Sequence, residues 1–88
     1  MFNKKKSQKE YEYCIENVTT KDTFDAQCRM LQQNLLDLQK DDLVVSDDGS
    51  LMQFYIYRGM EISVLYDTDL QEIYVKSPID IEDYILNT

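Results

Sequence analysis

The sequence contains no histidine. Histidine is the commonest general base and a leading transition-metal ligand, so its absence argues against His-based triads and most metal sites. Glycine is also scarce, and its two residues, Gly49 and Gly59, both stand where tight turns are expected. No glycine-rich loop is therefore left to cradle a phosphate. We predict a protein that is not an enzyme, with no catalytic, cofactor-binding or metal-binding residues.

The two cysteines, Cys14 and Cys28, are too few for a disulfide scaffold and lack the spacing of a metal site. Neither has a sequence neighbour that would lower its pKa, so we predict two small buried hydrophobes on helix faces. The acidic residues at 47–49 and 67–72 fit turns better than Ca²⁺ or Mg²⁺ loops, because the second lacks the central glycine and final glutamate of an EF-hand.

Long apolar runs are also missing. None approaches the ~18 residues of a membrane span, and the apolar part of a signal peptide is absent from the N-terminal sequence MFNKKKSQKEYEY. We therefore expect a cytoplasmic protein with no membrane contact. Frequent Lys, Asn, Asp and Ile, with few Gly and Pro, suggest a bacterial or phage source with an AT-rich genome.

Acidic residues dominate what is present: 17 Asp and Glu stand against 9 Lys and Arg, for a net charge of −8. Four lysines lie in residues 1–9, so residues 10–88 carry 17 acids and five bases, a balance of −12. Such a body is repelled by nucleic acid and favours a basic partner, although acidity also simply keeps small domains soluble. We expect residues 1–9 to be a flexible basic N-terminus and residues 10–88 to form one α+β domain.

Helical periodicity predicts two helices before the strands. In residues 10–18, Tyr11, Cys14, Ile15 and Val18 follow the spacing of a helical stripe. The stronger pattern begins with a capping box at Thr19 and Asp22, ends near Lys40, and is expected to cover a sheet because it is too short for a coiled coil. Its inward residues are Phe24, Cys28, Leu31, Leu35 and Leu38.

Alternation of apolar and polar residues predicts four antiparallel strands, near residues 43–46, 51–57, 60–66 and 70–76. A short helix from Pro78 to about Leu86, capped by Ser77, should follow. The predicted fold is an α+β domain of two N-terminal helices, a four-stranded antiparallel β-meander and a short C-terminal helix. The order is α-α-β-β-β-β-α, with the helices packed on one face of the sheet.

Loop lengths decide which face of a sheet each residue joins. A two-residue loop at Asp48 and Gly49 would place Val45 opposite Met52. The two-residue loop is the prediction, and a three-residue loop, which would choose Val44 instead, is left open as the alternative.

At the second hairpin, a three-residue loop over residues 57–59 pairs Phe54 with Ile62 and puts the glycine where positive φ is needed. The third hairpin is expected to pair Val64 with Ile73. The predicted core face of the sheet is Met52, Phe54, Ile56, Ile62, Val64, Ile73 and Val75.

Seven tyrosines are the one compositional feature that suggests a binding surface. Tyrosine is enriched at protein interfaces, although antiparallel sheets also favour it on a wet face. The register places Tyr55, Leu65 and Tyr74 on the uncovered face, with Tyr57 at its rim. The acidic neighbours argue against base stacking with nucleic acid. The predicted protein interface is Tyr55, Tyr57, Leu65 and Tyr74.

These features predict a small acidic protein-interaction module. Its sharper form is an inhibitor, antitoxin or immunity-type adaptor that binds a basic surface of another protein. One alternative is a homodimeric structural protein that associates through the outer sheet face. A lower alternative is an enzyme or small-ligand carrier, which no set of residues supports.

Overall fold

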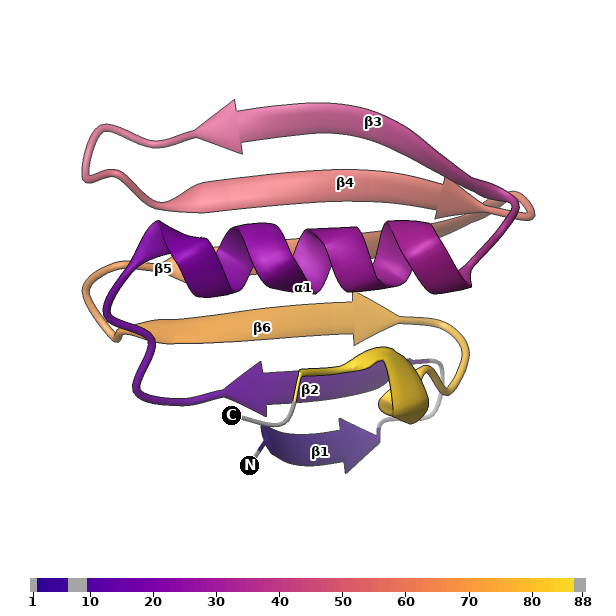
Figure 1. The fold of residues 1–88 in the computed structure, drawn as a ribbon, viewed down its shortest axis with the longest axis horizontal. Coiled ribbons are helices and arrows are strands. Elements are labelled where there is room, and N and C mark those ends of the chain that lie inside the picture. The colour runs from indigo at the N-terminus through magenta and orange to yellow at the C-terminus, as the bar shows by residue number, and fades with distance from the viewer. Residues whose placement is uncertain (1, 7–9, 87–88) are drawn as a thin grey trace.

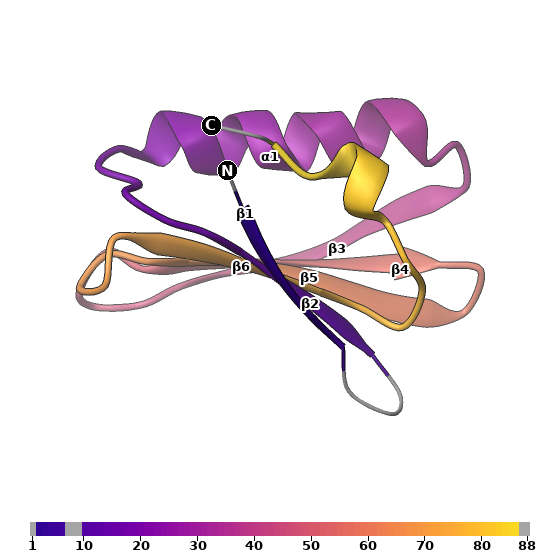
Figure 2. The same ribbon diagram turned by 90° about the horizontal axis from the view of Figure 1, so that it is seen from below.

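The structure, a computed structural model, describes residues 2–6 and 10–86. The elements are β1 (Phe2–Lys6), β2 (Tyr11–Ile15), α1 (Lys21–Asn34), β3 (Leu38–Val45), β4 (Leu51–Tyr57), β5 (Met60–Asp67), β6 (Glu72–Ser77) and the 3₁₀-helix η1 (Glu82–Tyr84). The described strands form one antiparallel sheet in the order β1-β2-β6-β5-β4-β3 (Figure 1). Both α1 and the C-terminal segment lie on the same side of this sheet (Figure 2).

The predicted arrangement of two helices before four strands is wrong at the N-terminus. Strand β2 occupies the segment predicted as the first helix, and the sheet begins with β1, inside residues 1–9. Tyr13 and Ile15 are fully buried, as alternate residues of a strand should be, whereas Cys14 points to the opposite face. The apparent helical stripe arose because it combined residues from both faces. Strand β2 is completed by β6, which places Tyr13 opposite Val75, and no local pattern reveals that pairing.

The helix α1 confirms the predicted inward stripe but not its length. Phe24, Cys28 and Leu31 are buried against the sheet, and so is Leu35 just beyond the last turn. The helix ends at Asn34 rather than near Lys40, because the residues from Leu38 onward pair with β4 as strand β3. The residue that caps the N-terminus is Thr20, and its side chain makes no capping hydrogen bond.

The predicted helix over residues 78–86 is also wrong, since only the 3₁₀ turn of η1 forms there. Ile81 and Ile85 nevertheless point inward and are buried beside α1. Side chains from elsewhere satisfy backbone groups that a helix would have paired internally. The buried amide of Gln27 donates to the carbonyl of Tyr84 (2.9 Å) and accepts from the N–H of Leu86 (2.8 Å).

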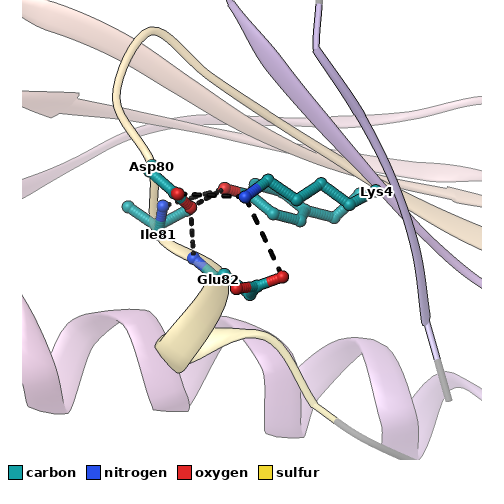
Figure 3. A network of polar contacts seen from close by, with 5 residues as sticks. Lys4, Asp80, Ile81 and Glu82 are labelled. Atoms are coloured by element: carbon teal, nitrogen blue, oxygen red, sulfur yellow. Dashed lines mark hydrogen bonds and ion pairs between the residues drawn. The ribbon is translucent and has the colours of Figure 1, made fainter.

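A second set of polar contacts fastens the C-terminal segment to the first two strands (Figure 3). The hydroxyl of Tyr13, from β2, donates to Asp80 Oδ1 (2.7 Å) and accepts from the backbone N–H of Ile81 (2.9 Å). Lys4, from β1, places its Nζ 3.0 Å from Asp80 Oδ2. The backbone N–H of Glu82 adds a bond to Asp80 Oδ1 (3.1 Å). A single carboxylate therefore joins β1, β2 and the chain after β6.

The Asp80 carboxylate should make the attachment of the C-terminal segment depend on pH. The hydrogen bond from Tyr13, with further help from Lys4, lowers the pKa of Asp80 to about 2. A group with a lowered folded pKa contributes stability above its unfolded pKa of ~3.9, and the contribution is lost as the pH falls through the folded value. We expect hydrogen-exchange protection at Ile81 to fall as the pH drops from about 4 to about 2. Asp80→Asn should remove that pH dependence, whereas Asp83→Asn should keep it, and identical profiles for all three proteins would contradict the assignment.

The hairpin between β3 and β4 has a three-residue loop that ends at Gly49. The N–H of Ser46 donates to the carbonyl of Ser50 (2.9 Å), and the N–H of Gly49 donates to the carbonyl of Ser46 (3.0 Å). Gly49 has φ of 89°, as the last position of a type I turn with a bulge requires. Val44 therefore lies opposite Met52. The two-residue loop is wrong, and the alternative left open is confirmed.

The loop between β4 and β5 is one residue shorter than predicted. It turns through two residues, Arg58 and Gly59, whose φ values of 51° and 80° are those of a type I′ turn. Tyr55 therefore lies opposite Ile62, and the predicted pairing of Phe54 with Ile62 is wrong. An arginine at positive φ is uncommon. The prediction therefore allowed positive φ only at Gly59, which led to a three-residue loop. The one-residue shift turns Met52, Phe54 and Ile56 away from the core.

The third hairpin is displaced by two residues from the predicted pairing, so its faces are unchanged. Val64 lies opposite Val75 instead of Ile73. The loop lies one step further along the chain because Asp67 Oδ1 accepts hydrogen bonds from the N–H groups of Asp69 (3.0 Å) and Leu70 (3.1 Å). The predicted core positions on β5 and β6 are all fully buried: Ile62, Val64, Ile73 and Val75.

Candidate protein-interaction surface

The sheet face opposite α1 is covered by no helix of the described residues, since α1 and η1 share the other side (Figure 2). Five apolar side chains cross this face in one row, directly opposite one another on successive strands. We call them the outer row: Cys14, Tyr74, Leu65, Met52 and Val44. The first four are half-buried by their neighbours, and Val44 at the sheet edge is 49% exposed. The row is a continuous apolar stripe across five strands.

A hollow of about 290 Å³ lies beside the outer row. Its apolar side is formed by Met52, Leu65 and Tyr74. Its polar side includes Glu12 and Lys76, which face each other two residues along their strands from Cys14 and Tyr74. Lys76 Nζ lies 4.0 Å from Glu12 Oε2. The hollow is open and combines an apolar wall with a charged rim. This suits an anchoring side chain from another protein better than an enclosed substrate.

Two titratable groups on this face have raised pKa values. Tyr74 donates its hydroxyl hydrogen to Glu72 Oε1 (2.5 Å), and this bond raises the pKa of Tyr74 above its ordinary value. Burial, reinforced by the Glu72 carboxylate, raises the pKa of Cys14 to about 11. The thiol is therefore protonated at neutral pH and is a poor nucleophile.

Acidic side chains flank the outer row on β2, β5 and β6. Side chains an even number of positions from Leu65 or Tyr74 point to the same face of the sheet. On β5 these include Glu61 and Asp67, and on β6 they include Glu72, so all three share the outer face with Glu12. Lys76 is the cation that β6 contributes to this face. On these three strands the apolar row is thus flanked mainly by negative charge.

The four predicted interface residues are not brought together. Leu65 and Tyr74 are neighbours on the outer face, which is the face predicted for them. Tyr55 is 0% exposed beneath α1, so its predicted place on the outer face is wrong. Tyr57 is half-buried against the core, and its ring lies 5.1 Å from the Arg58 guanidinium. The interface role itself stays a prediction for Leu65 and Tyr74.

Sequence reasoning missed Met52 and Val44 as members of this face. The alternation that includes Met52, Phe54 and Ile56 was visible, but it was assigned to the core because one apolar face was assumed. Both faces of β4 in fact carry large side chains, with Leu51 and Tyr55 inward. Only the turn at Arg58 decides between them.

The sheet edge at β3 is poorly suited to pairing with another strand. A bulge interrupts its register between Lys40 and Leu43. The buried amide of Gln53 donates to the carbonyls of Asp41 (2.8 Å) and Asp42 (3.2 Å), which fixes the bulge. Bulges and charged side chains are the usual protection of an edge strand, so the face is a better candidate surface than the edge.

Within residues 2–6 and 10–86, no group of three or more Cys, Asp or Glu side chains is placed to hold a metal ion. The described helices do not include one with the length and apolar character needed to cross a membrane.

Comparison with known proteins gives no guide to function. No family model, no curated protein and no solved structure matches the chain. Function is therefore inferred from the surface chemistry described above.

Proposed function

We propose that this protein is a small, non-enzymatic interaction module that binds a partner protein through its outer sheet face. The observation that supports the proposal is the outer row, an apolar stripe across five strands that no described helix covers. Contiguous apolar surface rimmed by polar residues is characteristic of interaction sites. The hollow beside Leu65 and Tyr74 would accept one anchoring side chain of the partner.

Charge defines the partner further. Residues 10–88 carry a balance of −12, and Glu12, Glu61, Asp67 and Glu72 share the outer face with the apolar row. A partner with an apolar centre and a basic rim would be complementary in both respects. An inhibitor or immunity-type adaptor that occupies a basic site on its target fits this description.

The charges also bear on the homodimer alternative. A two-fold axis through the outer face would place the same patch against itself. The acidic rims of the two copies would then face each other, and like charges across an interface oppose association. A different, basic protein is therefore the favoured partner, and a dimer is an outcome that the test below can recognise.

The test uses a pair of substitutions that removes apolar area while keeping residues suited to strands. Leu65→Thr/Tyr74→Thr should weaken capture of the specific partner about tenfold or more, because central anchors commonly contribute ~2 kcal/mol or more. Capture should also weaken with added salt. The control, Leu36→Thr/Leu70→Thr, removes leucines that are 92% and 60% exposed and lie in turns outside the strands.

The measurement is quantitative affinity purification of the tagged full chain from the source cell, together with sedimentation of the purified protein. A partner retained equally by both variants would refute the proposal. A concentration-dependent dimer that Leu65→Thr/Tyr74→Thr abolishes would establish the homodimer instead.

A further inference from the structure

The two flanks of α1 are covered differently. On the side of β6 and β2, residues 78–86 pack beside the helix and bury Ile81 and Ile85 (Figure 1). On the side of β3, no part of the described chain takes the equivalent place, and every β3 residue after Leu38 is exposed. The sheet is wider than its helical cover, which leaves a recess along β3.

This recess is a groove of about 240 Å³ between α1 and the strands β3 and β4. Phe24 and Cys28 contribute to its helix wall, Leu43 of β3 lies on the other side and is 52% exposed, and Leu51 and Tyr55 of β4 also line it. The volume is below the ~300–1,000 Å³ of small-molecule sites. It suits one or two side chains of a chain segment better than an enclosed cofactor.

The groove is cationic, although residues 10–88 carry a strongly negative net charge. Three of the five bases in residues 10–88 line it: Lys21, Arg29 and Lys40. Asp25, the one acid among the lining residues, lies 3.3 Å from Lys21. Arg29 and Lys40 have no acid within ion-pair distance among the described residues. Burial is the main cause that raises the pKa of Cys28, and the charge of Asp25 adds to the rise. The hydrogen bond with Tyr55 and the charges of Lys40 and Arg29 oppose it, so all three groove charges act at this wall.

We propose that the groove binds an acidic, apolar segment of a partner protein. The segment would run along β3 beside α1, with an apolar side chain on Leu43 and a carboxylate between Arg29 and Lys40. Charge complementarity carries the assignment, because two unpaired cations from separate elements converge here while the rest of residues 10–88 repels anions. The site lies on the helix side of the sheet and does not rest on the function proposed for the outer face.

A peptide titration followed by NMR tests this proposal on the ¹⁵N-labelled full chain. The probe is an acetylated, amidated heptapeptide of alternating Glu and Leu, and its counterpart carries Lys in place of Glu. We expect the acidic peptide to shift the backbone amides of Cys28, Leu43 and Tyr55, and the basic peptide to leave them unchanged. Arg29→Gln/Lys40→Gln should raise the Kd for the acidic peptide about tenfold or more, as the loss of two charge-assisted contacts implies.

The matched control is Arg58→Gln/Lys76→Gln, which removes the same charge from the two bases of residues 10–88 that do not line the groove. This variant should keep the Kd within about twofold. All four side chains are surface-exposed, so each double variant should fold, and its amide spectrum will show this directly.

Three results would overturn the proposal. One is the absence of groove shifts at millimolar peptide, and another is an equal loss of affinity in both double variants, which would indicate net charge alone. The third is a shift pattern centred on Leu65 and Tyr74, which would place the peptide on the outer face.

Discussion

Replacing Tyr55 with alanine is expected to lower the free energy of unfolding by about 3–5 kcal/mol, the range for deleting a large buried aromatic side chain. Tyr55 is 0% exposed beneath α1, opposite Ile62, and its hydroxyl accepts a hydrogen bond from Gln32 Nε2 (2.6 Å). Alanine would leave a cavity between helix and sheet and also remove this bond. The measurement is urea unfolding of the purified chain, followed by circular dichroism.

The matched substitution is Tyr74→Ala in the same sheet. Tyr74 is half-buried on the outer face, so alanine there should cost about 1 kcal/mol and leave no enclosed cavity. Equal losses at Tyr55 and Tyr74 would contradict the assignment of the two residues to opposite faces. This difference also decides which residues suit the binding test, because a Tyr55 variant would lose partners by unfolding. Substitutions at Tyr74 and Leu65 change the outer face without removing a core side chain.

Replacing Gln27 with leucine should detach the C-terminal segment at a cost of about 1–3 kcal/mol, the usual penalty for leaving a buried polar group unpaired. Gln27 is fully buried, and its amide holds both Tyr84 and Leu86 by their backbone groups. Leucine has a similar size but offers neither donor nor acceptor. We therefore expect faster hydrogen exchange at Leu86 and loss of protection at Ile85, with smaller changes in the strands.

Gln33→Leu is the control, because Gln33 is exposed on the same helix and the change there should stay within about 0.5 kcal/mol. If Gln27→Leu left exchange at Leu86 unaltered, the amide would not be the anchor described here. If it unfolded all strands together, the segment would be part of one cooperative unit with the sheet.

The elements that depend on nearby residues were predictable. Strands β4, β5 and β6 lie within about two residues of their predicted places, because alternation and turn residues are local signals. The inward stripe of α1 at Phe24, Cys28 and Leu31 was predictable for the same reason. The helix predicted from the periodicity of Tyr11 to Val18 does not form, since these residues pair as β2 with β6, far along the chain.

The errors at the candidate site arose in the turns. Arg58 adopts a φ of 51° that its side chain disfavours, and this single residue decides which face of β4 joins the core. Tyr55 was consequently expected outside and Met52 inside, whereas Leu65 and Tyr74 were placed correctly because a two-residue displacement keeps a strand's faces. The C-terminal helix failed for another reason, since Gln27 and Tyr13 satisfy backbone groups from a distance.

The position of β6 between β2 and β5 also sets the order in which this protein can fold as it is synthesised. Cys14 in β2 and Glu72, the first residue of β6, are in contact but 58 residues apart in the chain. The nascent hairpin of β1 and β2 therefore has no sheet to join until β6 has left the ribosome, and until then Tyr13 and Ile15 lack their cover. Closing such a distant pair is slow relative to the local hairpins. The meander from β3 to β6 should thus assemble first, and the N-terminal strands should dock last.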